Sequence, residues 1–211
     1  MLTMGPRVPE KLRPDLALIS DWIPSNAHIL DLGCGEGALL AYLNAERGVT
    51  GYGLEIDEDE IAAAIGGGVN VIQGDVDDGL QQYAAGSFDF VVMTQALQAL
   101  QRPDLAIGEM LRVGRTAIVT FPNFGHWMAR LDVLRGRMPL TRTMPEHWYD
   151  SENIHLCTVR DFEVLCEEND WRITRRNLLN HDHQDGWLQR FAPNLFTEIA
   201  VYMLESRKEA A

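Results

Sequence analysis

The chain has 211 residues, of which 46% are apolar and 23% charged, proportions that predict one ordinary globular domain and exclude a disordered or fibrous protein. A formal net charge of -13 repels phosphate backbones and anionic membrane surfaces, so neither nucleic acid nor lipid is expected as a partner. The three cysteines form an odd set without metal-ligand spacing, which argues against a disulfide framework and a zinc site and favours a reducing compartment.

The N-terminal segment Met1–Glu10 contains prolines and charges but no apolar signal core, and no apolar run in the chain approaches the length that a bilayer crossing needs. We therefore expect a cytoplasmic protein without a membrane partner. From Pro9 to Ile23 apolar residues recur at helical spacing and stop before Pro24, which predicts a leading helix.

Strands and helices alternate through the first half of the chain. A short apolar run, His28–Leu32, stops at glycines and is followed by good helix formers from Ala38 to Ala45. A helix is also predicted over Pro103–Arg112, and an acidic helix start over Asp57–Glu60. Further strands are predicted at Gly51–Ile56, Val69–Gln73, Phe88–Met93 and Thr116–Phe121. Such alternation predicts an α/β fold with a parallel, doubly wound sheet.

After Pro122 the pattern changes to a stretch rich in aromatic residues and histidine, which is broken by prolines and partly helical only between His126 and Leu134. This stretch runs to Cys157 and does not look like core sheet. We interpret residues 123–157 as a lid or partner-binding insertion within a single domain that spans residues 1–211.

The closing elements resume the regular pattern. A helix with a capping-box-like start is predicted from Thr158 to about Asn169. Trp171–Asn180 and Glu198–Leu204 are predicted to be two closing strands, and His181–Asn194 connects them. These two strands bring the predicted sheet to seven.

The strongest functional signal is the segment Asp31-Leu-Gly-Cys-Gly-Glu-Gly37, which lies where the first strand turns into its helix. Its glycines allow positive φ angles and let the backbone approach a ligand closely. A dinucleotide fingerprint reads G-x-G-x-x-G and holds a pyrophosphate at the helix N-terminus, whereas these glycines are spaced G-x-G-x-G after a carboxylate. Because a carboxylate repels pyrophosphate and suits an ammonium group, the motif favours the methionine moiety of a cofactor over NAD.

This segment resembles motif I of the class I, Rossmann-like methyltransferases that depend on S-adenosylmethionine (SAM). The resemblance implies a seven-stranded, mostly parallel sheet with helices on both faces, and SAM or S-adenosylhomocysteine as the cofactor, with Asp31 near its ammonium. Glu55 matches the acid that binds both ribose hydroxyls, and Asp75 matches the residue that receives the adenine amino group. The implied cofactor residues are Asp31, Gly33, Cys34, Gly35, Gly37, Glu55, Ile56, Asp75, Val76 and Met93.

Two of these carboxylates also have plain structural interpretations. Glu55 fits a solvated strand end, and Asp75 fits the cap of a helix that includes Leu80. Both acids stand at strand ends that meet in one crevice, which favours the ligand-binding interpretation. Cys34 is interpreted as a small turn residue, because nothing in the sequence supplies a base or cation that would activate its thiol.

The resemblance extends over nearly the whole chain, from about Leu12 to Met203, through the segments Thr94–Gln98, Phe121–Trp127 and Trp148–Thr158. Together these segments resemble the MetW family of methionine biosynthesis proteins, which have a methyltransferase-like fold. The resemblance implies a SAM-binding protein that acts with MetX, the homoserine O-acyltransferase, as an accessory or regulatory subunit. It implies no particular methyl acceptor, and a SAM-dependent methyltransferase acting on an unidentified small molecule stays the alternative.

Aromatic residues and histidines of the insertion fit a pocket, a partner surface or plain core packing. His126 and His155 are the candidate catalytic residues, since an unperturbed imidazole titrates near neutrality and can move a proton. No metal site is predicted, because His126 and His155 have no metal-binding spacing to His147, and His181 and His183 lie in a polar connection. The segment Phe121–Tyr149 is the predicted partner contact, and its arginines fit either an anion or partner site or a solvated face.

Overall fold

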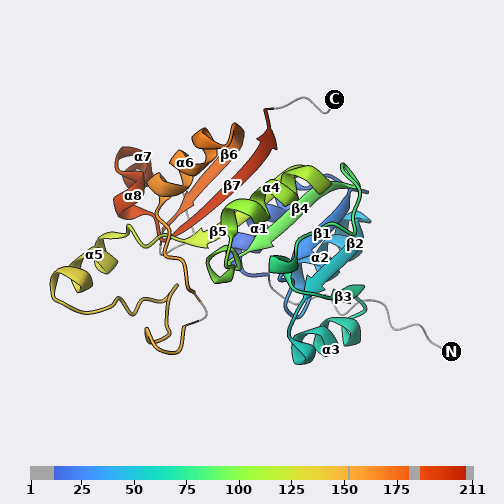
Figure 1. Cartoon of the computed structure of the whole chain (residues 1–211), viewed down its shortest axis with the longest axis horizontal. Coiled ribbons are helices and arrows are strands. Elements are labelled where there is room, and N and C mark those ends of the chain that lie inside the picture. Colours follow the sequence, from blue (N-terminus) through green and yellow to red (C-terminus); the bar gives the residue numbers. More distant parts are fainter. Residues whose placement is uncertain (1–11, 152, 181–185, 208–211) are drawn as a thin grey trace. The chain divides into compact units, whose positions relative to one another are not determined.

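The structure, a computed structural model, describes residues 12–151, 153–180 and 186–207, and Figure 1 shows its elements in chain order. Two features discussed above lie outside the described residues, namely Met1–Glu10 and the pair His181 and His183. The helices are α1 (Pro14–Trp22), α2 (Ala38–Arg47), α3 (Glu58–Gly66), α4 (Pro103–Val113), α5 (Trp127–Leu134), α6 (Val159–Glu168), α7 (Trp187–Phe191) and α8 (Pro193–Phe196). The strands are β1 (His28–Leu32), β2 (Thr50–Glu55), β3 (Val71–Gln73), β4 (Phe88–Thr94), β5 (Gly114–Pro122), β6 (Trp171–Leu179) and β7 (Ile199–Ser206). Two 3-10 turns, η1 (Val76–Asp78) and η2 (Leu97–Ala99), complete the set.

The strands of the described residues form one seven-stranded mixed sheet in the order β3-β2-β1-β4-β5-β7-β6. β1 pairs in parallel with both β2 and β4, with Leu32 opposite Leu54 and Met93. β2 pairs in parallel with β3, whereas β6 and β7 pair antiparallel with an irregular register between Ile173 and Arg175. The seven strands predicted from the sequence are confirmed.

The chain divides into two compact units, the first comprising residues up to 94 together with 105–118, and the second comprising 95–104 together with the chain from 119 onward. In the first unit the strand order reverses at β1, because the chain moves out through β2 to β3 and returns to β4 on the other side. Since βαβ crossovers are right-handed, this reversal places α2 and α3 on one face of the sheet and α4 on the opposite face.

Local sequence explains most boundaries of the first unit. Ile29 and Leu30 of β1 are completely buried, as expected for a central parallel strand covered on both faces. α3 begins after Asp57, whose carboxylate accepts hydrogen bonds from the amides of Asp59 and Glu60. β3 begins two residues later than predicted, because the amide of Val69 still donates to a carbonyl of α3, that of Ala64.

An aromatic cluster forms the core of the second unit. Phe121 of β5, Phe162 of α6 and Tyr202 of β7 are fully buried, with ring centroids 4.7 to 5.9 Å apart. α6 begins where the capping pattern predicts, because Thr158 Oγ1 accepts a hydrogen bond from the amide of Asp161. The connection between β6 and β7 contains the short helices α7 and α8, which the sequence did not predict.

Asn123 fixes the start of the insertion, residues 123–157. The residue is 1% exposed, and its amide nitrogen donates to the carbonyls of Asn194 and Thr197 at 3.1 and 2.8 Å. Its side-chain oxygen accepts from the amides of Gly125 and Val159 at 3.0 and 3.2 Å. A single side chain therefore ties the exit of β5 to the ends of α8 and α6. Within the described residues, no helix combines the length and apolarity that a membrane crossing requires.

Candidate functional site

The turn between β1 and α2 is built from glycines in the left-handed region. Gly33, Gly35 and Gly37 have φ angles of 66°, 53° and 73°, where other residues are strained. The amides of Gly33 and Cys34 both donate to the carbonyl of Leu54, at 2.8 and 3.3 Å. These bonds fix the turn against the end of β2.

Asp31, next to this turn in β1, is a buried acid with an unsatisfied oxygen. The residue is 2% exposed, and its Oδ1 has no hydrogen-bond partner among the residues that the structure describes. Burial, and secondarily the charge of Glu55, raises the pKa of Asp31 from 3.8 to about 7, while Arg13 acts in the opposite direction. Because an unpaired buried carboxylate costs free energy, either protonation of Asp31 or a cation bound beside Oδ1 relieves that cost.

A cavity of about 370 Å³ opens beside Asp31 in the first unit. It lies at the carboxyl ends of β1 and β4, where the strand order reverses and where open α/β sheets bind their ligands. The glycine turn forms one wall. This wall includes Glu36, and the remaining walls include Arg13, Leu16, Asp31, Glu60 and Thr94.

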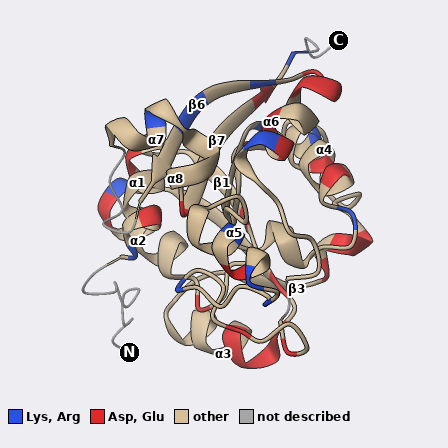
Figure 2. Ribbon diagram, turned by 90° about the vertical axis from the view of Figure 1, so that its left-hand side faces the viewer, with Lys and Arg blue, Asp and Glu red and all other residues tan. Residues whose placement is uncertain are grey.

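The walls of this cavity are predominantly acidic. Among the described residues that line it, Asp31, Glu36 and Glu60 contribute three carboxylates and Arg13 contributes one guanidinium. Desolvation and the neighbouring charge of Glu36 raise the pKa of Glu60 above its ordinary value. Figure 2 shows the acidic residues that begin α3, the helix to which Glu60 belongs. Such a cavity attracts cationic ligands and repels phosphate groups.

Glu55 closes β2 and holds the glycine turn. Its Oε2 accepts a hydrogen bond from the amide of Gly35 at 2.8 Å, and its Oε1 accepts from the amides of Ile56 and Asp57 at 2.8 and 3.1 Å. A carboxylate has about four acceptor positions, so backbone amides use most of its capacity. The adjacent Ile56 is 60% exposed and leaves an apolar surface next to the acid.

Asp75 follows β3 at the same edge of the sheet, because the amide of Gly74 donates to the carbonyl of Glu55 at 3.0 Å. The Oδ1 of Asp75 accepts from the amide of Asp77 at 2.9 Å and caps η1. Asp75 is therefore a capping residue, as one interpretation of the sequence holds. The capped element is a 3-10 turn that ends before Leu80, not the helix that the sequence predicted.

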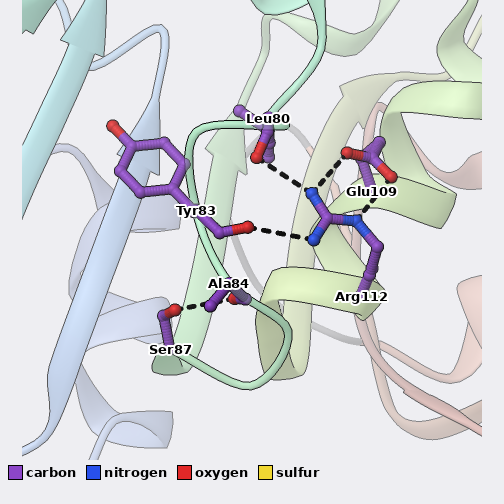
Figure 3. A network of polar contacts seen from close by, with 6 residues as sticks. All are labelled: Leu80, Tyr83, Ala84, Ser87, Glu109 and Arg112. Atoms are coloured by element: carbon purple, nitrogen blue, oxygen red, sulfur yellow. Dashed lines mark hydrogen bonds and ion pairs between the residues drawn. The ribbon is translucent and has the colours of Figure 1, made fainter.

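Arg112 of α4 holds the segment that follows η1, as Figure 3 shows. Its guanidinium donates to the carbonyls of Leu80 and Tyr83 at 2.9 and 3.0 Å. The same group forms a bidentate ion pair with Glu109, with both N–O distances at 2.7 Å. Ser87 closes the turn by donating to the carbonyl of Ala84 at 2.6 Å. No pattern in the sequence predicted this network.

The structure brings only part of the predicted cofactor set to the cavity. Asp31, Gly33, Cys34 and Gly35 line it, and Glu55 joins them through Gly35. Met93 is completely buried, and the next residue, Thr94, lines the cavity in its place. Six of the ten predicted residues do not line it, namely Glu55, Met93, Gly37, Ile56, Asp75 and Val76. Sequence reasoning missed Arg13, which carries no motif, and interpreted Glu60 only as part of an acidic helix start.

Cys34 packs over Gly53 of β2, where an added Cβ would lie 2.3 Å from the cysteine sulfur. Burial, followed by the charges of Asp31 and Glu55, raises the pKa of Cys34 to about 12. The thiol is therefore protonated at neutral pH and is a poor nucleophile. Its small size, which lets the turn lie close to β2, explains its position.

The two candidate catalytic histidines lie in the second unit and have different surroundings. His126 is 8% exposed, and burial lowers its pKa, with Glu198 acting in the opposite direction. His155 is exposed, and its amide donates to the carbonyl of Gln98 at 3.0 Å, while its Nε2 lies 3.1 Å from the carbonyl oxygen of Gln101. In the described part of the chain, no group of three or more His, Cys, Asp or Glu residues is arranged to hold a metal ion.

Known proteins match this chain both in sequence and in fold. The family model described as "Methionine biosynthesis protein MetW" matches residues 13–204. The bifunctional methionine biosynthesis protein MetXA/MetW of Rhodopirellula baltica is 30% identical over 232 residues, which cover 94% of this chain and 36% of that protein. The chain thus spans about a third of the length of this relative.

Two solved structures share the fold at low sequence identity. A SAM-dependent methyltransferase from Archaeoglobus fulgidus is 16% identical, with a TM-score of 0.66 over 90% of this chain and 92% of that one. A second, from Mesorhizobium loti, is 18% identical, with a TM-score of 0.62 over 92% of this chain and 98% of that one. The fold is therefore the Rossmann-like fold of class I methyltransferases. Since the family model spans nearly all of this fold, from α1 to β7, the chain belongs to the MetW family of methionine biosynthesis proteins.

Proposed function

We propose that the chain binds SAM, or its product S-adenosylhomocysteine, in the acidic cavity of the first unit. The observation that carries the proposal is the buried Oδ1 of Asp31, which has no partner among the described residues and whose ionised form a bound cation would stabilise. SAM supplies an ammonium group in its methionine moiety and a second positive charge on its sulfonium. Both charges suit the described part of the walls, which holds three carboxylates and one guanidinium.

Residues at the ends of β2 and β3 fit the remainder of the cofactor. Glu55 would accept a hydrogen bond from the ribose at the acceptor position that is left by the three backbone amides, which already orient its carboxylate. The exposed side chain of Ile56 offers an apolar surface to the adenine ring. Asp75 would receive the adenine amino group. When bound, SAM supplies an electrophilic methyl group, while these residues bind and orient the cofactor.

Melting experiments with matched ligands test the cofactor assignment. SAM at about 100 times its dissociation constant is expected to stabilise the fold by about 2.7 kcal/mol, which raises the melting temperature by roughly 5 to 11 °C for a chain of this size. S-adenosylhomocysteine should also raise it, and NAD should not, because the acidic cavity repels a pyrophosphate. A rise with NAD, or none with SAM, contradicts the assignment.

We further infer that the chain acts with a MetX-type homoserine O-acyltransferase as an accessory or regulatory subunit. The support is the family membership and the relative in which MetXA and MetW form one polypeptide. The insertion offers a surface for such contact, because it exposes large apolar side chains of the kind found at protein interfaces. This insertion surface consists of Trp127, Leu134, Met138, Leu140, Trp148 and Tyr149.

The arginines of the insertion are less suited to this contact than the apolar residues. Arg130 donates to the carbonyl of Gly125 at 2.6 Å, and Arg135 lies 3.8 Å from Asp132, so both have partners within the insertion. Leu134 and Trp148, by contrast, are 84% and 73% exposed. These two side chains are therefore the sharper test of a docking surface.

The experiment is a pull-down with the acyltransferase of the same organism, with and without SAM. Leu134→Glu and Trp148→Ala are expected to weaken the complex at least tenfold, because interface anchors contribute about 2 kcal/mol or more each. Phe191→Ala is the matched control, because Phe191 is 82% exposed but lies outside the insertion. Equal loss in all three variants, or none in any, contradicts the proposed docking surface.

The same experiment separates an accessory subunit from a small-molecule methyltransferase. If SAM changes the affinity of the complex, linkage requires that the partner change the affinity for SAM by the same factor. Absence of a complex under every condition, together with methyl transfer from SAM to a metabolite of the cell extract, would favour the alternative function. That alternative is supported by the methyltransferases among the structures that share this fold.

A further inference from the structure

A second cavity, of about 190 Å³, lies within the second unit and shares no lining residue with the proposed SAM site. The first turn of α5, the turn over residues 141–144 and Glu198 immediately before β7 contribute to its walls. The volume corresponds to about six water molecules in the liquid. An occupant is therefore limited to a small metabolite.

His126 indicates that this cavity receives a polar ligand. The residue is 8% exposed and lines the cavity, and its ring nitrogens have no hydrogen-bond partner among the described residues. An imidazole at a cavity wall that bonds to no described residue keeps its donor and acceptor nitrogens available to a ligand. Burial lowers the pKa of His126, which keeps the ring neutral with one donor and one acceptor nitrogen.

Two opposite charges lie side by side in the same wall. Arg142 Nη2 is 3.7 Å from Glu198 Oε2, an attraction across a distance too long for a hydrogen bond between these two atoms. The Glu198 side chain is only 14% exposed, whereas that of Arg142 is 52% exposed. A ligand that carries both a carboxylate and an ammonium group matches this pair of charges.

The first turn of α5 adds to the carboxylate side of the cavity. Met128 and Ala129 of this turn line the cavity, and no side chain caps the helix. Uncapped amides at a helix N-terminus favour a negative group. Met128, Ala129 and Met144 also supply apolar surface, which suits a short hydrocarbon side chain.

We propose that this cavity binds a free α-amino acid with a small apolar side chain. Arg142 and the first turn of α5 hold its carboxylate, while Glu198 and the acceptor nitrogen of His126 hold its ammonium. The apolar residues of the walls cover its side chain. No bond is made or broken, and the proposal depends neither on SAM nor on MetX.

Calorimetry on the full chain tests the proposal with glycine, L-alanine, L-valine and L-leucine as probes. Affinity should rise from glycine towards the larger members as more apolar surface is buried. Two analogues of L-valine remove one charge each, namely 3-methylbutanoate, which lacks the amino group, and 2-methylpropylamine, which lacks the carboxylate. Each analogue should bind at least tenfold more weakly than L-valine, because it loses the charged contact with either Arg142 or Glu198.

Substitutions locate the binding site. Arg142→Gln, Glu198→Gln and His126→Phe should each weaken L-valine at least tenfold, with melting temperatures confirming that the variants fold. Arg137→Gln is the matched control and should leave the affinity unchanged, because Arg137 is an exposed arginine of the same insertion that does not line the cavity.

Saturating SAM should also leave the affinity for L-valine unchanged. The proposal is overturned if none of the four amino acids binds or if 3-methylbutanoate binds as well as L-valine. It is equally overturned if SAM competes with the amino acid or if Arg142→Gln and Glu198→Gln both bind L-valine normally.

Discussion

Replacing Asp31 by asparagine should stabilise the protein without ligand and at the same time weaken SAM binding. Asp31 is 2% exposed, and no described residue bonds to its Oδ1. Burial and the charge of Glu55 raise its pKa to about 7, while Arg13 acts in the opposite direction. Asparagine keeps the shape of the side chain and removes the charge that is costly to bury.

The structure sets the size and the sign of this effect. A raised pKa means that the folded state binds the proton more tightly than the unfolded state, so Asp31 destabilises the fold increasingly as pH rises from about 4 to about 7. A rise of the pKa from 3.8 to about 7, at about 1.4 kcal/mol for each tenfold change in proton affinity, gives at most about 4 kcal/mol above pH 7. The smaller part of this penalty is present at pH 5.

Urea unfolding without SAM at pH 5 and pH 8 measures the effect. The free energy of unfolding of Asp31→Asn, relative to that of the natural protein, should increase by about 3 kcal/mol between pH 5 and pH 8. Taking the difference between the two pH values removes any pH-independent effect of the amide. Asp21→Asn, which changes a carboxylate that is 73% exposed, is the control for general charge effects. The same difference at both pH values would refute the assignment of Asp31 as a buried, unpaired acid. SAM affinity of Asp31→Asn should fall about tenfold to hundredfold, because a hydrogen bond to a charged group is worth about 1.5 to 3 kcal/mol.

Three further predictions address the site and its support. Glu55→Ala should lower the affinity for SAM at least tenfold in calorimetry, because it removes a charged acceptor and releases the amide of Gly35. Unchanged affinity would mean that Glu55 is only the end of a strand. Arg112→Met should lower the free energy of unfolding by about 2 kcal/mol because two carbonyls and Glu109 lose their partner, whereas Arg115→Met, at an exposed ion pair, should stay within about 0.5 kcal/mol. Burial raises the pKa of all three cysteine thiols to about 12. A disulfide reagent at pH 8 should therefore label the folded protein at least about a hundredfold more slowly than a free thiol, and fast labelling would contradict this burial.

The features that the sequence predicts well are those set by local interactions. The Thr158 cap, the acidic start of α3 and the glycine turn each depend on residues within a few positions of one another, and the structure confirms all three. The strands are predicted because apolar runs between glycines and polar residues need no knowledge of distant partners. The end of the predicted strand Val69–Gln73 is also correct. Its start is not, because the amide of Val69 donates back to α3.

The features that the sequence misses depend on distant contacts. Arg13 reaches the cavity from the segment before α1, and nothing in its neighbourhood distinguishes it from any other surface arginine. Arg112 supports two carbonyls that lie 29 and 32 residues away in the chain. Asp75 lies at the predicted place, but the choice between a cap and a ligand contact depends on where its carboxylate points. The motif thus predicts which strand ends meet, whereas the hydrogen-bond partners of the side chains can be identified only in the structure.

The two acids at the centre of the proposed SAM site are held in opposite ways, and this difference determines how ligand binding and pH should be coupled. Glu55 accepts three backbone hydrogen bonds before any ligand arrives, so its carboxylate is oriented in advance and little ordering is left for binding. Asp31 has an oxygen with no partner in the described part of the chain, so the ligand-free protein carries the cost of its burial, and protonation relieves that cost. A bound ammonium relieves the same cost while keeping Asp31 ionised, and ligand and proton therefore compete for one buried oxygen. Between pH 5 and pH 7, SAM binding should accordingly release a proton from Asp31, and the Asp31→Asn variant should lose this release.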